Sequence, residues 1–169
     1  FQDARINKHG YDPIEDVMKD NERPLTTAQV KAEVKKGALI IDTRKADDFE
    51  KGFIAGSINL GLNGQFAVWV GTLIDIQQPL VLITDAGKES ETVLRLARVG
   101  YENVVGYLQG GVAAWDEPLH RVHSIEAKEL KQFASAEVLD VRKPGEWNVS
   151  HLKGAQFVPL GDMPSNLSE

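Results

Sequence analysis

The stretch from Pro79 to Gly100 limits the fold more than any other part of the sequence. Residues 80–83 form a short apolar run, which is typical of a strand buried on both faces of a sheet. The polar loop T-D-A-G-K-E-S (84–90) follows, and then a helical apolar pattern that ends at Gly100. Such a strand, loop and helix direct the N–H groups of the loop and the positive helix N-terminus at one spot. We therefore expect any reaction centre at residues 84–90.

Similar patterns on both sides of this stretch predict an α/β fold. Thr26 and Gln29 have the spacing of a capping box at the start of a helix. Apolar runs at 38–42 and 103–108 predict two more strands, and the apolar spacing from Phe66 predicts an amphipathic helix. Strands that alternate with helices imply a parallel sheet covered on both faces.

Part of the sequence occurs twice. Residues 39–45 (L-I-I-D-T-R-K) recur as residues 137–143 (E-V-L-D-V-R-K), an offset of 98 (140 − 42). The same offset relates Ser124 to the expected helix cap Thr26, and also relates Phe49 to Trp147, Ile54 to Leu152 and Gly56 to Gly154. A period of one small domain indicates a duplicated module. The second copy has no counterpart of residues 80–115, so we expect it to pack on the first copy or to be completed by another molecule, through domain swapping or homo-oligomerisation.

Composition excludes several classes of protein. The net charge of −6 argues against a binder of nucleic acid or of a membrane surface. No apolar run approaches the roughly 20 residues that span a bilayer. The absence of cysteine excludes disulfides and thiolate chemistry within this sequence, and a cytoplasmic location is the default expectation. The sequence begins with Phe1, which we interpret as a sign that it is a piece of a longer protein.

Several ordered motifs resemble those of rhodanese-like (sulfurtransferase) domains. They are L-I-I-D-T-R from Leu39, P-L-V-L-I-T from Pro79, and G-Y-E-N-V-V-G-Y-L-Q-G-G-V-A-A-W from Gly100. D-V-R-K-P-G-E-W-x3-H-L-K-G-A from Asp140 resembles the start of a second such domain. The resemblance implies a three-layer α/β rhodanese-like fold with a central parallel sheet, plus an incomplete second copy. It assigns residues 25–117 to the first domain, 118–122 to a linker and 123–169 to the N-terminal half of the second domain.

The N-terminal segment F-Q-D-A-R-I-N-K-x-G-Y suggests a wider context. Together with the paired modules it resembles the C-terminal half of metallo-β-lactamase-fold proteins fused to tandem rhodanese domains. The resemblance implies that residues 1–24 are a tail or linker from a preceding domain, a metal-dependent hydrolase or persulfide dioxygenase that holds zinc or iron. The expected partners are this preceding domain and the remainder of the second rhodanese domain. We expect no cofactor or metal in the present chain.

The resemblance also identifies what the loop lacks. In active rhodaneses a cysteine at the strand end accepts a sulfane sulfur as a persulfide. Aligning the loop on Gly87 and Ser90 puts Thr84 at that position, and an alternative register puts Asp85 there. Neither side chain forms a persulfide. We therefore expect a vestigial loop with no catalytic residue, and in an active version the cysteine would lie in the missing part of the second copy.

Alternative roles remain open for individual residues. The N–H groups of the loop (Thr84, Asp85, Ala86, Gly87, Lys88, Glu89 and Ser90) are an anion-binding candidate, although Glu89 and Glu91 oppose an anion. Asp85 is either a nucleophile or acid/base group, or, more simply, the cap of the next helix. Asp42 and Arg44 either line the pocket or form a structural ion pair. The histidines show no metal-ligand spacing, and His151 reads as structural.

The sequence thus favours a catalytically silent rhodanese-like module of a larger sulfur-metabolism protein, with a structural or regulatory role. One alternative is a module that binds an anion or a protein partner. The other is a hydrolase or transferase that uses Asp85.

Overall fold

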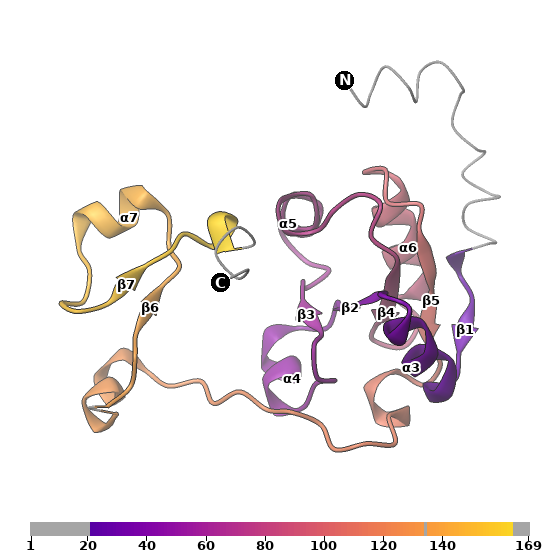
Figure 1. The fold of residues 1–169 in the computed structure, drawn as a ribbon, viewed down its shortest axis with the longest axis horizontal. Helices are drawn as coiled ribbons and strands as arrows, with labels where there is room; N and C mark the ends of the chain where they lie inside the picture. Colours follow the sequence, from indigo (N-terminus) through magenta and orange to yellow (C-terminus); the bar gives the residue numbers. More distant parts are fainter. Residues whose placement is uncertain (1–20, 134, 164–169) are drawn as a thin grey trace, which may run out of the picture. The chain divides into compact units, whose positions relative to one another are not determined.

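The computed structural model describes residues 21–133 and 135–163. The chain divides into two compact units, Phe1–His123 and Ser124–Glu169 (Figure 1). Each unit has its own sheet.

The first unit is built on a five-stranded parallel sheet, in the order β1-β5-β4-β2-β3 (Figure 1). Its strands are β1 (Pro24–Leu25), β2 (Leu39–Asp42), β3 (Ile58–Asn59), β4 (Leu80–Ile83) and β5 (Val104–Leu108). All four residues of β4 are buried, as the continuous apolar run predicts for a central strand. The carboxyl ends of β2 and β4 lie side by side, because Asp42 pairs with Ile83.

Helices cover both faces of this sheet. They are α3 (Thr27–Lys35), α4 (Ala46–Lys51), α5 (Phe66–Leu73), α6 (Glu89–Ala97) and the short 3-10 helix η1 (Gly111–Ala114). The predicted capping box is confirmed, since the Thr26 side chain accepts from the Gln29 N–H and the Gln29 side chain accepts from the Thr26 N–H.

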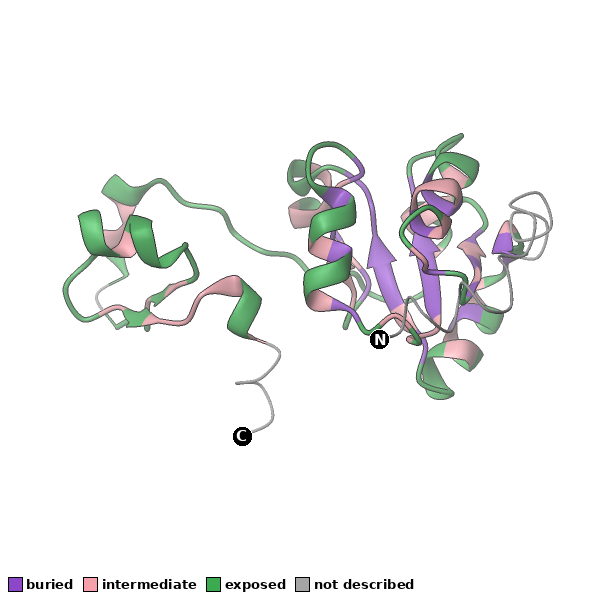
Figure 2. Cartoon of the chain, turned by 90° about the horizontal axis from the view of Figure 1, so that it is seen from above, coloured by how far each residue is buried: buried purple, intermediate pink, exposed green. Residues whose placement is uncertain are grey.

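Two apolar clusters hold the layers together. On one face α5 and α6 pack on the sheet through buried residues that include Phe66, Val70, Val93 and Leu96. On the other face Val30 of α3 packs with Ile40 of β2 and with Ile54, and the half-buried Trp115 lies against this cluster. The buried strands stand out in Figure 2. The structure thus has the expected α/β fold with a central parallel sheet.

The sequence analysis missed the edge strand β1. Pro24 and Leu25 pair in parallel with Tyr107 and Leu108, and Leu25 is fully buried. Gly106 permits this approach, because a Cβ at this position would stand 2.3 Å from the Arg23 carbonyl oxygen. The expected boundary after residue 24 therefore divides β1, because Pro24 falls in the tail and Leu25 falls in the domain. The rest of that tail, residues 1–20, lies outside the described residues.

The linker assigned to residues 118–122 is also attached to the first unit. His120 and Phe53 form an antiparallel bridge, in which each backbone N–H donates to the other's carbonyl at 2.9 and 2.8 Å. Phe53 in turn stacks on Phe49 with ring centroids 4.2 Å apart. The first unit accordingly extends to His123.

The second unit repeats part of this architecture with far less burial (Figure 2). It contains the 3-10 helix η2 (Ala127–Gln132), β6 (Leu139–Asp140), α7 (Pro144–Val149), β7 (Gln156–Phe157) and the 3-10 helix η3 (Leu160–Asp162), and β6 pairs with β7 in parallel. The expected cap at Ser124 is wrong: η2 begins after Glu126, whose backbone N–H donates to the Glu129 side chain at 2.8 Å. Glutamate therefore replaces the threonine cap of the first copy, two residues later in the repeat.

Candidate functional site

The loop of residues 84–90 occupies the predicted place between β4 and α6. Thr84 follows directly after the last residue of β4 and is only 6% exposed. Gly87 has φ +80°, a conformation that side-chain-bearing residues rarely adopt, and lets the chain turn toward the helix. The Asp85 carbonyl accepts a hydrogen bond from the Lys88 N–H at 3.0 Å. The turn expected after β4 is thus formed, with Thr84 at its base.

Asp85 does not cap α6, contrary to the simpler of the two expectations. The N-terminal cap of this helix is Lys88, and no side chain bonds to the helix amides there. Asp85 is exposed, and its side chain contributes to the wall of a pocket instead. The helix does not need a carboxylate cap, because Glu89 and Glu91 in its first turn already complement the positive end of the helix dipole.

A pocket of about 270 Å³ opens beside this loop. Segments that follow β2, β3 and β4 meet there at the carboxyl edge of the sheet, where ligands bind in open α/β folds. Its lining residues are Thr43, Lys45, Ala46, Gly61, Leu62, Asn63, Asp85, Lys88 and Glu91. The charged side chains that line the pocket include both cations and anions, so the pocket is not strongly positive.

Several charged side chains near the loop form ion pairs with other side chains of the protein. Lys88 lies 2.8 Å from Glu91, and this hydrogen bond lowers the pKa of Glu91 and raises that of Lys88. Arg95 is 3.8 Å from the same carboxylate and donates to the Leu62 carbonyl. Ser90 donates from its hydroxyl to Glu22. Lys88 and Ser90, two of the anion-binding candidates, are therefore engaged by carboxylates of the protein itself.

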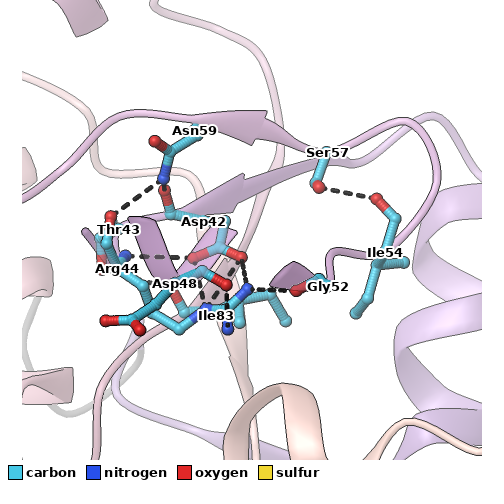
Figure 3. A network of polar contacts seen from close by, with 9 residues as sticks. All are labelled: Asp42, Thr43, Arg44, Asp48, Gly52, Ile54, Ser57, Asn59 and Ile83. Atoms are coloured by element: carbon cyan, nitrogen blue, oxygen red, sulfur yellow. Dashed lines mark hydrogen bonds and ion pairs between the residues drawn. The ribbon is translucent and has the colours of Figure 1, made fainter. Parts of the chain in front are cut away.

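Asp42 and Arg44 form a buried ion pair at the end of β2 (Figure 3). Arg44 Nη2 lies 2.6 Å from Asp42 Oδ2, and Nε lies 2.9 Å from Oδ1. The same Nη2 donates to the Gly52 carbonyl at 2.9 Å, which ties β2 to the end of α4. Neither side chain lines the pocket, whereas Thr43 between them does. Of the two expected roles, the geometry therefore supports the structural one.

Sequence reasoning missed two residues that shape this edge. Asn59 donates from its side-chain amide to the carbonyls of Asp42 and Arg44, at 2.9 and 3.0 Å (Figure 3). Thr43 donates from its backbone N–H to the Ile83 carbonyl at 2.8 Å. Both hold the end of β2 in place through backbone atoms, for which the sequence carries no clear signal.

The described residues offer little other chemistry at this site. No group of three or more His, Asp or Glu side chains there is arranged to hold a metal ion. His151 belongs to the second unit and stacks on Trp147 with ring centroids 3.8 Å apart, consistent with a structural role. No helix in the described part of the chain is long and apolar enough to cross a membrane.

A family model described as "Rhodanese-like domain" matches residues 26–118, a segment that contains the loop, the pocket and most of the sheet. The chain belongs to the rhodanese-like domain family. The chain is 37% identical over 83 residues to the Escherichia coli K12 "Uncharacterized protein YibN". That alignment covers 48% of this chain and 57% of the relative, so the chain spans little more than half the length of the curated protein that it matches.

Solved structures support the fold of the rhodanese-like domain. The solution structure of the rhodanese-like domain of the Anabaena Alr3790 protein has a TM-score of 0.51 and 17% identity, over 60% of this chain and 80% of the other. The crystal structure of the Alr3790 protein has a TM-score of 0.50 and 14% identity, over 66% of this chain and 89% of the other. At these identities the likeness is one of fold alone.

Proposed function

We propose that this chain is a catalytically silent rhodanese-like module with a structural or regulatory role in a larger sulfur-metabolism protein. The observation that carries the proposal is Thr84 at the end of β4, in a sequence without cysteine. Sulfur transfer requires a thiolate, which attacks the sulfane sulfur of a donor, forms a persulfide S–S bond and displaces the rest of the donor, sulfite in the case of thiosulfate. A threonine hydroxyl cannot form that bond.

The surroundings of the loop support this proposal. Glu89 and Glu91 compensate the helix N-terminus, and Lys88 is paired with one of them. An anionic sulfur donor would have to compete with these carboxylates for the same positive charges. The backbone turn persists, however, since Gly87 keeps its left-handed conformation. The loop therefore keeps its backbone turn but lacks the cysteine sulfur atom that would react.

A gain-of-function experiment tests the proposal. The wild-type chain is expected to show no transfer of sulfur from thiosulfate to cyanide, whereas Thr84→Cys is expected to gain the mass of one sulfur atom after exposure to thiosulfate. Asp85→Cys, the alternative register of the loop, serves as the control and is expected to stay unmodified. Turnover by the wild-type chain, lost in Asp85→Asn, would overturn the proposal in favour of the Asp85 enzyme. Sulfur uptake by Asp85→Cys alone would overturn the assignment of Thr84.

We also propose the wider context suggested by the sequence. In this proposal a metallo-β-lactamase-like hydrolase or persulfide dioxygenase domain with zinc or iron precedes the module, and the remainder of a second rhodanese domain follows it, in the cytoplasm. The support is the resemblance of residues 1–11, which lie outside the described residues, together with the repeat at an offset of 98 (140 − 42). Intact mass and metal analysis of the protein from its native source test it. A metal-free product with the 18.6 kDa mass of this chain would contradict it.

A further inference from the structure

The segment that leads into α5 contains the one Asn-Gly pair of the sequence, Asn63-Gly64. Both residues are exposed, and residues 61–65 belong to no helix or strand. Gly64 has φ +80°, and a Cβ placed on it would meet no atom within 4 Å. Asn63 also lines the pocket beside the loop of residues 84–90. The pair is therefore open to solvent and forms part of the pocket wall.

Within the described residues, nothing restrains the two groups of this pair that can react with each other. The Asn63 side-chain amide forms no hydrogen bond there, and the Gly64 N–H donates to no acceptor there. Asn59 is the contrast, because its amide donates to two backbone carbonyls at 2.9 and 3.0 Å and the bulky Leu60 follows it. Of these two asparagines, Asn63 alone combines a free amide with an unhindered neighbouring nitrogen.

We propose that Asn63 is a site of spontaneous deamidation. The backbone nitrogen of Gly64 attacks the side-chain carbonyl carbon of Asn63, and the new C–N bond closes a succinimide ring. Ammonia leaves with the proton that the Gly64 nitrogen gives up. Water then opens the ring at either carbonyl, which leaves an aspartate or an isoaspartate at position 63. Glycine favours the ring closure because no side chain shields its nitrogen, and water is the only co-reactant.

The reaction changes the charge of the pocket. The charged residues that line it are two lysines, Lys45 and Lys88, and two acids, Asp85 and Glu91, so their formal charges cancel. A carboxylate at position 63 gives the wall an excess of negative charge, which disfavours an anion and favours a cation. Deamidation therefore alters what the pocket can bind while the encoded sequence stays the same. The inference does not rest on the catalytic silence of the loop.

Peptide mapping of the full chain, incubated at mildly alkaline pH and physiological temperature, tests the proposal. Cleavage by trypsin after Lys51 and Lys88 releases residues 52–88, which contain both Asn59 and Asn63. The expected result is a gain of about 1 Da at residue 63, the difference between an amide and a carboxyl group, in separate aspartate and isoaspartate peaks. Asn59 should stay unmodified. The rate should rise with pH, because the attacking nitrogen must lose its proton.

Two variants and the unfolded chain make this test decisive. Gly64→Ala is expected to slow the conversion about tenfold, because a methyl group hinders the attacking nitrogen. Asn63→Gln should stay unmodified, because its longer side chain would have to close a larger ring. The chain unfolded in urea reports the reactivity of the pair without the fold. Conversion in urea but not in the folded chain would overturn the proposal, as would equal conversion of Asn59 or an unchanged rate in Gly64→Ala.

The Glu91 carboxyl reports the change in pocket charge. The hydrogen bond from Lys88 lowers the pKa of Glu91 below its ordinary value. Asn63→Asp reproduces the charge of the deamidated chain and should raise this pKa, because a nearby negative charge disfavours ionisation. Asn63→Gln, which adds no charge, should leave it unchanged. An NMR titration of the Glu91 carboxyl carbon compares the variants, and equal pKa values in both would overturn the inferred effect on the pocket.

Discussion

The two units contain the same Asp-x-Arg clamp with the same internal geometry. In the first, Arg44 Nε lies 2.9 Å from Asp42 Oδ1, and Nη2 donates to the Gly52 carbonyl at 2.9 Å. In the second, Arg142 Nε lies 2.9 Å from Asp140 Oδ1, and Nη2 donates to the Ser150 carbonyl at 2.9 Å. In both, the arginine stands two residues after the aspartate and reaches a carbonyl eight residues further on. The geometry is therefore specified by the local sequence.

The surroundings of the two clamps differ. The side chains of Asp42 and Arg44 are 1% and 9% exposed, whereas those of Asp140 and Arg142 are 10% and 43% exposed. The first clamp lies in a sheet where β2 is flanked by both β3 and β4, and in the described part of the second unit β6 pairs with β7 alone. The comparison shows that a local motif fixes an interaction, while the rest of the domain decides what the interaction contributes to stability.

Replacing the arginine of each clamp should cause the largest difference in stability loss between the two units. Arg44→Met leaves the buried Asp42 carboxylate without its partner, and a destabilisation of the first unit by about 3–5 kcal/mol is expected. Arg142→Met leaves a carboxylate that water can reach, so a much smaller effect is expected in the second unit. Hydrogen exchange of the β2, β4 and β6 amides, followed by mass spectrometry, measures each unit separately. Equal loss of protection in both units would contradict the comparison.

Ile54 and its counterpart in the repeat, Leu152, should also contribute unequally to stability, with a smaller difference than that between the two arginines. Ile54→Ala removes a side chain that is 3% exposed and creates a cavity, for which a loss of about 2–4 kcal/mol is expected. Leu152→Ala removes a side chain that is 49% exposed, and less than about 1 kcal/mol is expected. Urea unfolding of the purified variants checks both values, with circular dichroism at low urea as the control for an intact fold. A Leu152→Ala loss as large as that of Ile54→Ala would mean that Leu152 is covered in solution.

The same contrast between local and tertiary effects explains what the sequence could predict. The apolar runs of β2 and β4, the Thr26 capping box and the loop after β4 follow from patterns within a few residues of each other, and they were predicted correctly. The edge strand β1 has only two residues and is held by Tyr107 and Leu108, far along the chain. Asp85 has the residue type of a cap, but the acids of the first turn of α6 make that cap unnecessary.

At the candidate site, a pocket lies beside the loop that the sequence singled out, but the sequence did not identify all of the side chains that line this pocket. Asp42 and Arg44 were recognised as a pair because they stand on the same side of an extended chain. Whether they face the pocket or each other depends on the Gly52 carbonyl, which α4 places next to the guanidinium. The positions of Thr43 and Asn63 in the pocket wall likewise depend on how three strand ends meet. These are tertiary facts that a single sequence does not display.

The smallest expected effect concerns the pH dependence of the exposed clamp. The hydrogen bond from Arg142 lowers the pKa of Asp140 below its ordinary value, with a lesser contribution from the charge on His151. Because the folded-state pKa is depressed, the stabilisation is present above the ordinary pKa and is lost as the pH falls through the folded-state value. An NMR titration of the Asp140 carboxyl carbon should show its pKa rising toward the ordinary value in Arg142→Met.

His151→Gln should move the Asp140 titration much less, because the histidine acts only through its charge and Arg142 also donates hydrogen bonds. A larger shift in His151→Gln than in Arg142→Met would mean that the stacked Trp147–His151 pair, rather than the arginine, determines the charge state of Asp140. The clamp of the second unit would then share only its shape with that of the first, and the local sequence would specify the geometry without the electrostatics.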